Sequence, residues 1–413
     1  MSSPIDVNTK DASCLFDGSR LTLARNLLGF RKNELAAKIG KSQTAVAAWE
    51  QGTKRPTPSN VAALSIALGV DPGFFIAGVP NLRQPNTLPH FRSLRSTTQL
   101  QRDQADAYGT LAMEVAWMLE RNVEFRESDI PCIPASDDEE SDEPELAARA
   151  VREAWNLGSG PIRHMIRELE NHGIFVVFSP PRAASLDAFS VQAAPHSMVI
   201  LNPTKDDYYR QRFDVAHELG HLIMHADTDP GSHLVESQAN RFAAELLAPA
   251  DAIYDSLPTS INATTWRRLM DLKEEWRVSI QALLMRCRVL GRLSEVAYRN
   301  AMMSLSKNGW RRAEPGAIWV LEQPSILPRA VELLNAEGIS ECSIAKQGHI
   351  PLSLFRIITS RTPAELQDGD PIPEDNERRV VPLFSPHIEA TTSVGIETID
   401  GSEEKGGENH GER

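Results

Sequence analysis

The sequence has little of what marks secreted, membrane-spanning or disulfide-stabilised proteins. Only four of its 413 residues are cysteines, at positions 14, 132, 287 and 342, and no two of them form a C-x-x-C pair. This scatter is typical of reduced, isolated thiols. No apolar run approaches the roughly 18 residues of a membrane span, and residues 1–13 lack the apolar core of a secretion signal. We therefore expect a cytoplasmic protein without a membrane partner.

Positive charge is also scarce overall, but it is unevenly distributed. The net charge of −13 argues against indiscriminate nucleic-acid binding by the whole chain. Residues 20–55, however, contain eight Lys or Arg against two acids, whereas residues 127–145 contain nine acids and no base. This segregation predicts a basic head and an acidic spacer with different partners.

The strongest chemical signal is the pentapeptide His-Glu-Leu-Gly-His at 217–221. Apolar residues at 213, 216, 219, 222 and 223 follow a helical period. On such a helix His217 and His221 project from one face, at a spacing that suits two corners of a tetrahedral Zn²⁺ site. Glu218 lies beside them, where a carboxylate can accept a proton from a metal-bound water. The pattern predicts hydrolytic chemistry.

A third ligand is expected from the next helical segment, 236–247, which Pro249 ends. Glu236 would complete a His₂Glu site with one position open for water. Asn240, one turn further on the same face, would hold the outer nitrogen of a ligating histidine. Small residues at Gly220, Ala239 and Ala243 would let the two helices approach closely.

Other arrangements of ligands are weaker. The metzincin pattern needs glycine at 224 and histidine at 227, where this chain has Met224 and Asp227. We interpret His225 as a helix-end or substrate-side residue, because three imidazoles on consecutive turns cannot easily converge on one ion. Three alternative third ligands stay open: His233, Asp229 and Glu245.

HELGH followed by E-x-x-x-N-x-F-A-A-E-L-L-x-P resembles the ImmA/IrrE family of metallopeptidases, over about residues 90–315. The resemblance implies a zinc-dependent peptidase with His217, His221 and Glu236 as ligands and Glu218 as base. Some family members cleave a partner transcriptional repressor, which implies a protein substrate of that kind. The family often has glutamate where this chain has Gln238.

The basic head reads as five short helices at 20–28, 32–39, 42–51, 58–68 and 72–77. Gly40 would form the sharp turn, Ser42 the N-cap of the third helix, and Trp49 its buried side. The segment resembles the Cro/phage-repressor-like (XRE) helix-turn-helix family. On that geometry two residues would read base edges and four would contact phosphates of a double-stranded operator. These are Gln43 and Thr44 for the bases, and Lys32, Lys41, Lys54 and Arg55 for the phosphates. A homodimer on two half-sites is the expected arrangement.

The predicted fold is mainly α with a small antiparallel sheet, that is, α+β. Strands are expected at 174–178, 188–192 and 198–202, just before the metal helix, and one of the last two would offer an exposed edge to an extended peptide. The predicted division is 15–80 (helix-turn-helix), 81–145 (linker, helix and acidic loop), 146–258 (HExxH peptidase-like domain), 259–315 (helical, helix-turn-helix-like), 316–388 (helical C-terminal region) and 389–413 (disordered acidic tail).

Two functions compete at this point. The first is a sequence-specific DNA-binding transcriptional regulator that carries a zinc-dependent endopeptidase and cleaves a partner regulatory protein. The alternative is a non-proteolytic regulator whose metal domain senses a ligand or a metal. Glu218 favours the first, because a purely structural zinc site needs no base that is free of the metal.

Overall fold

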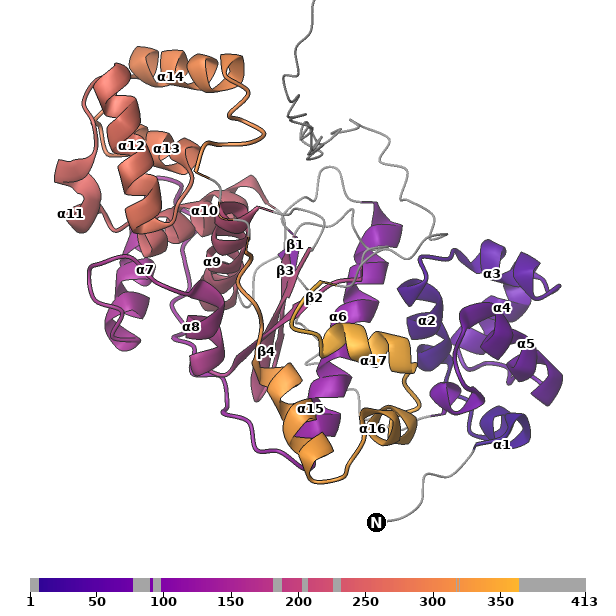
Figure 1. Cartoon of the computed structure of the whole chain (residues 1–413). Coiled ribbons are helices and arrows are strands. Elements are labelled where there is room, and N and C mark those ends of the chain that lie inside the picture. Colours follow the sequence, from indigo (N-terminus) through magenta and orange to yellow (C-terminus); the bar gives the residue numbers. More distant parts are fainter. Residues whose placement is uncertain are drawn as a thin grey trace, which may run out of the picture. The chain divides into compact units, whose positions relative to one another are not determined.

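The structure is a computed structural model that describes residues 7–76, 98–180, 188–202, 207–225, 232–316, 318 and 320–363, together with the backbone of 90–91 (Figure 1). All of these belong to one unit of the chain, residues 1–373. The predicted acidic tail lies outside the described residues, as do residues 81–89 and 92–97 at the start of the predicted linker region. Among the described residues no helix is both long and apolar enough to cross a membrane.

The basic head is a small helical bundle, as predicted. Its elements are α1 (Thr9–Cys14), α2 (Gly18–Leu27), α3 (Lys32–Lys38), α4 (Gln43–Glu50), α5 (Pro58–Leu68) and the 3₁₀ helix η1 (Pro72–Phe75). Ser42 caps α4 by accepting from the Ala45 amide, and Gly40 adopts φ +64° at the turn before it. Trp49 is buried, as expected. Helix α1, capped by Asn8, was not predicted.

The sheet is small, as predicted, but it is mixed rather than antiparallel. Its strands are β1 (His90–Phe91), β2 (Ile174–Phe178), β3 (Phe189–Ala193) and β4 (His196–Leu201), in the spatial order β1-β3-β4-β2. Strands β3 and β4 form an antiparallel hairpin, whereas β2 pairs with β4 in parallel. The prediction of an all-antiparallel sheet was wrong. After β2 the chain forms β3 one strand position away, and β4 then fills the position between them and runs parallel to β2.

The expectation of an exposed edge on β3 or β4 also needs correction. Strand β4 is central, because β3 and β2 flank it. One end of β3 is covered, since the backbone of β1 pairs with Phe189 and Ser190.

The two faces of the sheet belong to two different hydrophobic cores. One face, including Phe175, Val177 and Met198, packs with α6 (Gln99–Glu120), the head and the C-terminal helices. The other face, including Val176 and Val199, packs with α9 (Tyr208–Met224). Figure 1 shows α6 on one side of the strands and α9 on the other. Alternation along each strand thus places the sheet between two layers of helices.

Three further helices surround α9. They are α7 (Glu143–Ala154), α8 (Met165–Asn171) and α10 (His233–Leu247), and α10 makes contacts with both α9 and α7. Helices α9 and α10 approach closely at Gly220, where an added Cβ would lie 2.9 Å from Cδ1 of Phe242. The predicted role of a small residue at 220 follows from this contact.

The remaining chain is helical, as expected. Its elements are α11 (Ala250–Ile253), η3 (Tyr254–Ser256), α12 (Ala263–Trp276), α13 (Ile280–Val289), α14 (Glu295–Lys307), α15 (Ile326–Ala336), α16 (Glu341–Gln347) and α17 (Leu352–Ile358). The chain turns between α16 and α17, where His349 has a positive φ and Pro351 precedes α17.

Candidate metal centre

The two motif histidines lie on α9, in a fully buried part of that helix. Asp207 caps α9 by accepting from the Arg210 amide, and the helix continues without interruption to Met224. The side chains of His217 and His221 have no exposed surface. Because they are one turn apart on one face, both rings turn their Nε2 atoms toward the same point.

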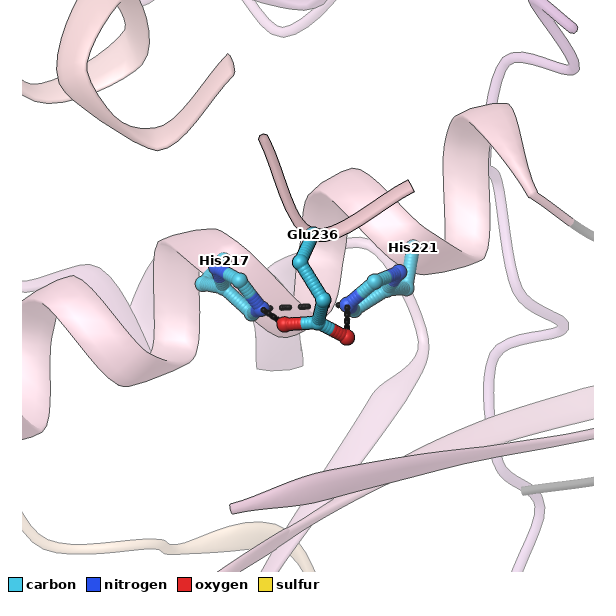
Figure 2. Close-up of side chains that lie close together, drawn as sticks. All are labelled: His217, His221 and Glu236. Carbon is cyan, nitrogen blue, oxygen red and sulfur yellow. Dashed lines mark hydrogen bonds and ion pairs between the residues drawn. The ribbon is translucent and has the colours of Figure 1, made fainter. Parts of the chain in front are cut away.

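Helix α10 brings Glu236 to that point. Ser232 caps this helix through the Val235 amide, which places Glu236 in its first turn. The Glu236 carboxylate lies 3.4 Å from Nε2 of His217 and 3.7 Å from Nε2 of His221. Figure 2 shows the carboxylate between the two rings, whose Nε2 atoms are 3.0 Å apart. The three residues form a group able to hold a metal ion.

The donor set of this group suits a divalent cation. The two Nε2 atoms are 3.0 Å apart, and the carboxylate turns a different oxygen to each ring, Oε2 at 3.4 Å from His217 and Oε1 at 3.7 Å from His221. One ligand atom from each of the three residues lies within 4.8 Å of the other two. Two imidazoles and a carboxylate are a donor set that zinc accepts. The residues that the sequence singled out therefore come together as a group able to hold a metal ion.

The outer nitrogen of His217 has the partner predicted for it. Nδ1 of His217 lies 3.2 Å from Oδ1 of Asn240. With Nδ1 donating to this oxygen, the Nε2 lone pair faces Glu236 and His221.

The outer nitrogen of His221 has a different partner, which the sequence did not predict. Nδ1 of His221 lies 3.0 Å from Nδ1 of His225, and Nε2 of His225 lies 2.9 Å from Oε1 of Gln238. His225 is the C-cap of α9 and is only 1% exposed. It lies behind His221 rather than on the substrate side. Burial lowers the pKa of His225, against the opposing effect of its hydrogen bond with Gln238.

Glu218, the expected base, lies buried between α9 and the sheet. Its carboxylate Oε2 accepts a 2.9 Å hydrogen bond from the hydroxyl of Ser190 on β3. Both side chains are buried, Glu218 completely. Ser190 was missed by the sequence analysis, because one serine in a strand carries no signal of its own. Only the pairing of β3 with α9 brings it to the site.

The alternative ligands that the structure describes do not join this group. His233 is exposed at the start of α10, and Asp229 lies outside the described residues. Glu245 is buried, where it pairs with Arg149 and Arg286. Among the described residues the group that can hold a metal is thus His217, His221 and Glu236.

Most of the residues predicted to contact DNA are exposed on the surface of the head. Gln43 and Thr44 are exposed at the start of α4, and Lys41, Lys54 and Arg55 are exposed in the segments before and after this helix. Lys32 differs, because its Nζ lies 3.0 Å from Oε2 of Glu50. Its predicted contact with a phosphate would have to compete with this ion pair.

The region 259–315 was predicted to be helical and helix-turn-helix-like, and in it Ser279 caps α13 by accepting from the Ala282 amide. Two of its arginines contact protein groups: Arg286 is 5% exposed and pairs with Glu245, and Arg292 donates to the carbonyl of Leu257. These guanidinium groups hold α13 against its neighbours in the protein.

Comparisons with known proteins agree with both halves of the sequence analysis. Residues 169–288 match the peptidase family model described as IrrE N-terminal-like domain, a stretch that includes all three members of the metal-binding group. Residues 21–75 match a helix-turn-helix family model. A comparison with curated proteins found no match.

Proposed function

We propose that this chain, which carries an IrrE N-terminal-like peptidase domain and an N-terminal helix-turn-helix domain, is a sequence-specific transcriptional regulator with a zinc-dependent endopeptidase. Its substrate would be a partner regulatory protein, such as a transcriptional repressor. The observation that supports the peptidase is the convergence of His217, His221 and Glu236 on one point, with Glu218 next to His217 in the same helix.

His217, His221 and Glu236 would hold the zinc ion and leave a fourth position free. When bound, zinc supplies Lewis-acid chemistry and lowers the pKa of water to near neutrality. Glu218 then accepts the proton of the attacking water and delivers it to the leaving amine of the cut peptide. The Ser190 hydroxyl fixes Oε2 of this carboxylate and so orients the base.

The head would choose where the regulator acts. Gln43 and Thr44 lie at the N-terminus of α4, the helix that would enter the major groove of a double-stranded operator. Lys41, Lys54 and Arg55 would fix its register through phosphates. Because one such head contacts few base pairs, a homodimer on two half-sites is the arrangement we propose.

The test is a cleavage assay on candidate partners. The full chain is incubated with each protein encoded by neighbouring genes, with and without a chelator, and the products are separated by mass. We expect one discrete cut in one partner, lost on chelation and lost in Glu218→Gln, which should still bind zinc. The exposed Glu274→Gln on α12 is the matched control and should cut normally.

Two results would count against the proposal. A cut that Glu218→Gln makes at the wild-type rate would remove the base from the mechanism. Zinc binding without a cut in any partner would instead favour the non-proteolytic regulator, in which the metal domain is a sensor.

A further inference from the structure

We infer that Gln238 and His225 are positioning residues that fix His221 in the tautomer required of a zinc ligand. The inference rests on the proposed metal site, and it concerns a relay of hydrogen bonds behind His221. The relay runs from the carbonyl of Ser136 through Gln238 and His225 to Nδ1 of His221.

The carbonyl of Ser136, at the end of the relay farthest from His221, determines which atoms donate and which accept along it. A backbone carbonyl oxygen can only accept, so the amide nitrogen of Gln238 must face the carbonyl of Ser136, at 2.7 Å. The Gln238 Oε1 atom therefore faces His225, 2.9 Å from Nε2. Because this oxygen can only accept, Nε2 of His225 must carry a hydrogen.

The hydrogen bond between the two imidazole rings has a fixed direction as well. Only one hydrogen fits between Nδ1 of His225 and Nδ1 of His221, which are 3.0 Å apart. A doubly protonated His225 would be a buried cation beside a metal site, which is unfavourable. The hydrogen therefore belongs to His221, and its Nε2 keeps a lone pair directed at His217 and Glu236.

The far end of the relay is itself held in place. The amide and the hydroxyl of Ser136 both donate to Glu143, and the Gln238 amide ties this segment to α10. The predicted acidic spacer thus contains a residue, Ser136, that supports the metal centre. Further along the same spacer, the carbonyl of Ser141 accepts a 2.6 Å hydrogen bond from Arg241 on α10. This bond holds the later part of the spacer against α10.

The two metal histidines are therefore oriented in different ways. Asn240, which orients His217, is exposed and acts through a single contact. His221 is oriented through two buried side chains and a backbone carbonyl. We expect substitutions in the relay to weaken zinc binding without touching a ligand, by the 10–100-fold typical of such outer partners.

The experiment compares Gln238→Met with Gln238→Glu in the full chain. Methionine keeps the volume but offers His225 no strong acceptor, so the zinc Kd measured by chelator competition should rise at least tenfold. Glutamate keeps an acceptor for His225, so its Kd should stay within about threefold of the wild-type value. The exposed Gln281→Met on α13 is the control and should leave the Kd unchanged.

A second measurement reads the tautomers directly and does not require that Gln238→Met folds. Long-range ¹⁵N–¹H spectra of the metal-free wild-type protein, labelled at histidine, should show hydrogen on Nδ1 of His221 and on Nε2 of His225. The reverse assignment at either ring would overturn the inference, as would wild-type zinc affinity in a folded Gln238→Met.

Failure of the inference can be told apart from failure of the proposed function. Both readouts are independent of cleavage, so a protein with the expected tautomers that cuts no partner would refute only the peptidase. A protein that cuts, but whose Gln238→Met variant binds zinc normally, would refute only the relay.

Discussion

The hydroxyl of Ser190 donates a hydrogen bond to the Glu218 carboxylate at 2.9 Å, and this contact joins β3 to α9 at the site. Ser190→Ala would remove a donor from a buried charged group, an interaction of about 1.5–3 kcal/mol. We expect the free energy of unfolding in urea to fall by about that amount, with the zinc content unchanged.

Ser179 provides the control for this prediction. It is also a buried serine, at the end of β2, but its hydroxyl has no hydrogen-bond partner among the residues that the structure describes. Ser179→Ala should therefore change the free energy of unfolding by much less than Ser190→Ala. Equal losses in the two variants would mean that the Ser190 hydroxyl contributes nothing specific.

Gly220→Ala should destabilise the protein, because the new methyl group would meet the Phe242 ring at 2.9 Å. Phe242 is completely buried and cannot move aside without opening α10 from α9. Overpacking of this kind costs about 1–3 kcal/mol, and denaturant unfolding would measure it. Gly160→Ala, where the added atom meets nothing within 4 Å, should be close to neutral.

Removal of the metal should lower the thermal stability. A ligand that binds only the folded state at 100 times its Kd adds about 2.7 kcal/mol, so chelation should lower the melting temperature. Protein purified without a histidine tag should contain about one zinc per chain, and His217→Ala and Glu236→Ala should contain none. His233→Ala, on the same helix as Glu236 but exposed, should retain the metal.

DNA binding should separate base contacts from phosphate contacts. Gln43→Ala should weaken binding to the operator by about 1–3 kcal/mol while sparing non-specific DNA. Lys54→Ala should weaken both and reduce the slope of log K against log salt by about one. Titrations at several salt concentrations measure both effects. Lys10→Ala, on exposed α1, should match the wild type, and the same result for Lys54→Ala would remove this lysine from the DNA contact.

The buried Glu114 should give stability a particular pH dependence. Burial raises the pKa of this carboxyl, although Arg20 lies 2.6 Å away and lowers it in part. A raised pKa means that the folded state binds more protons than the unfolded chain, so the contribution of Glu114 falls as the pH rises through the folded pKa.

Urea unfolding of the wild type and Glu114→Gln at several pH values tests this directly. We expect the stability of the wild type relative to Glu114→Gln to decline above the ordinary glutamate pKa. The exposed Glu124→Gln controls for the loss of one carboxylate. A difference between wild type and Glu114→Gln that does not vary with pH would contradict the expected shift.

The metal-binding group followed from the sequence because its geometry is local. Two histidines one turn apart on one helix fix most of the site, and Glu236 needed only a second helix with an apolar face. The same holds for the cap of α4, since Ser42 accepts from the amide three positions ahead.

The features that were missed depend on contacts between distant parts of the chain. Ser190 meets Glu218 only because β3 packs on α9, and Gln238 meets Ser136 across 102 positions of sequence. The parallel pairing of β2 with β4 likewise depends on which strand fills the middle of the sheet. The helix and strand periodicities of the sequence do not indicate these contacts between distant residues. His225, by contrast, was visible in the sequence because it continues the i+4 series of histidines.

Helix α6 has a neighbour on each side: the Tyr108 hydroxyl donates to the carbonyl of Phe178 on β2, and Gln104 donates to the carbonyl of Leu27 on α2. One hydrophobic core runs through the head, α6 and one face of the sheet. Residues of α2 are therefore constrained twice, by the helix-turn-helix bundle that they belong to and by the helix that supports the sheet. If the head reads an operator as proposed, a change of operator preference has to spare these shared contacts, and variation in specificity should be confined to α4 and the loops beside it.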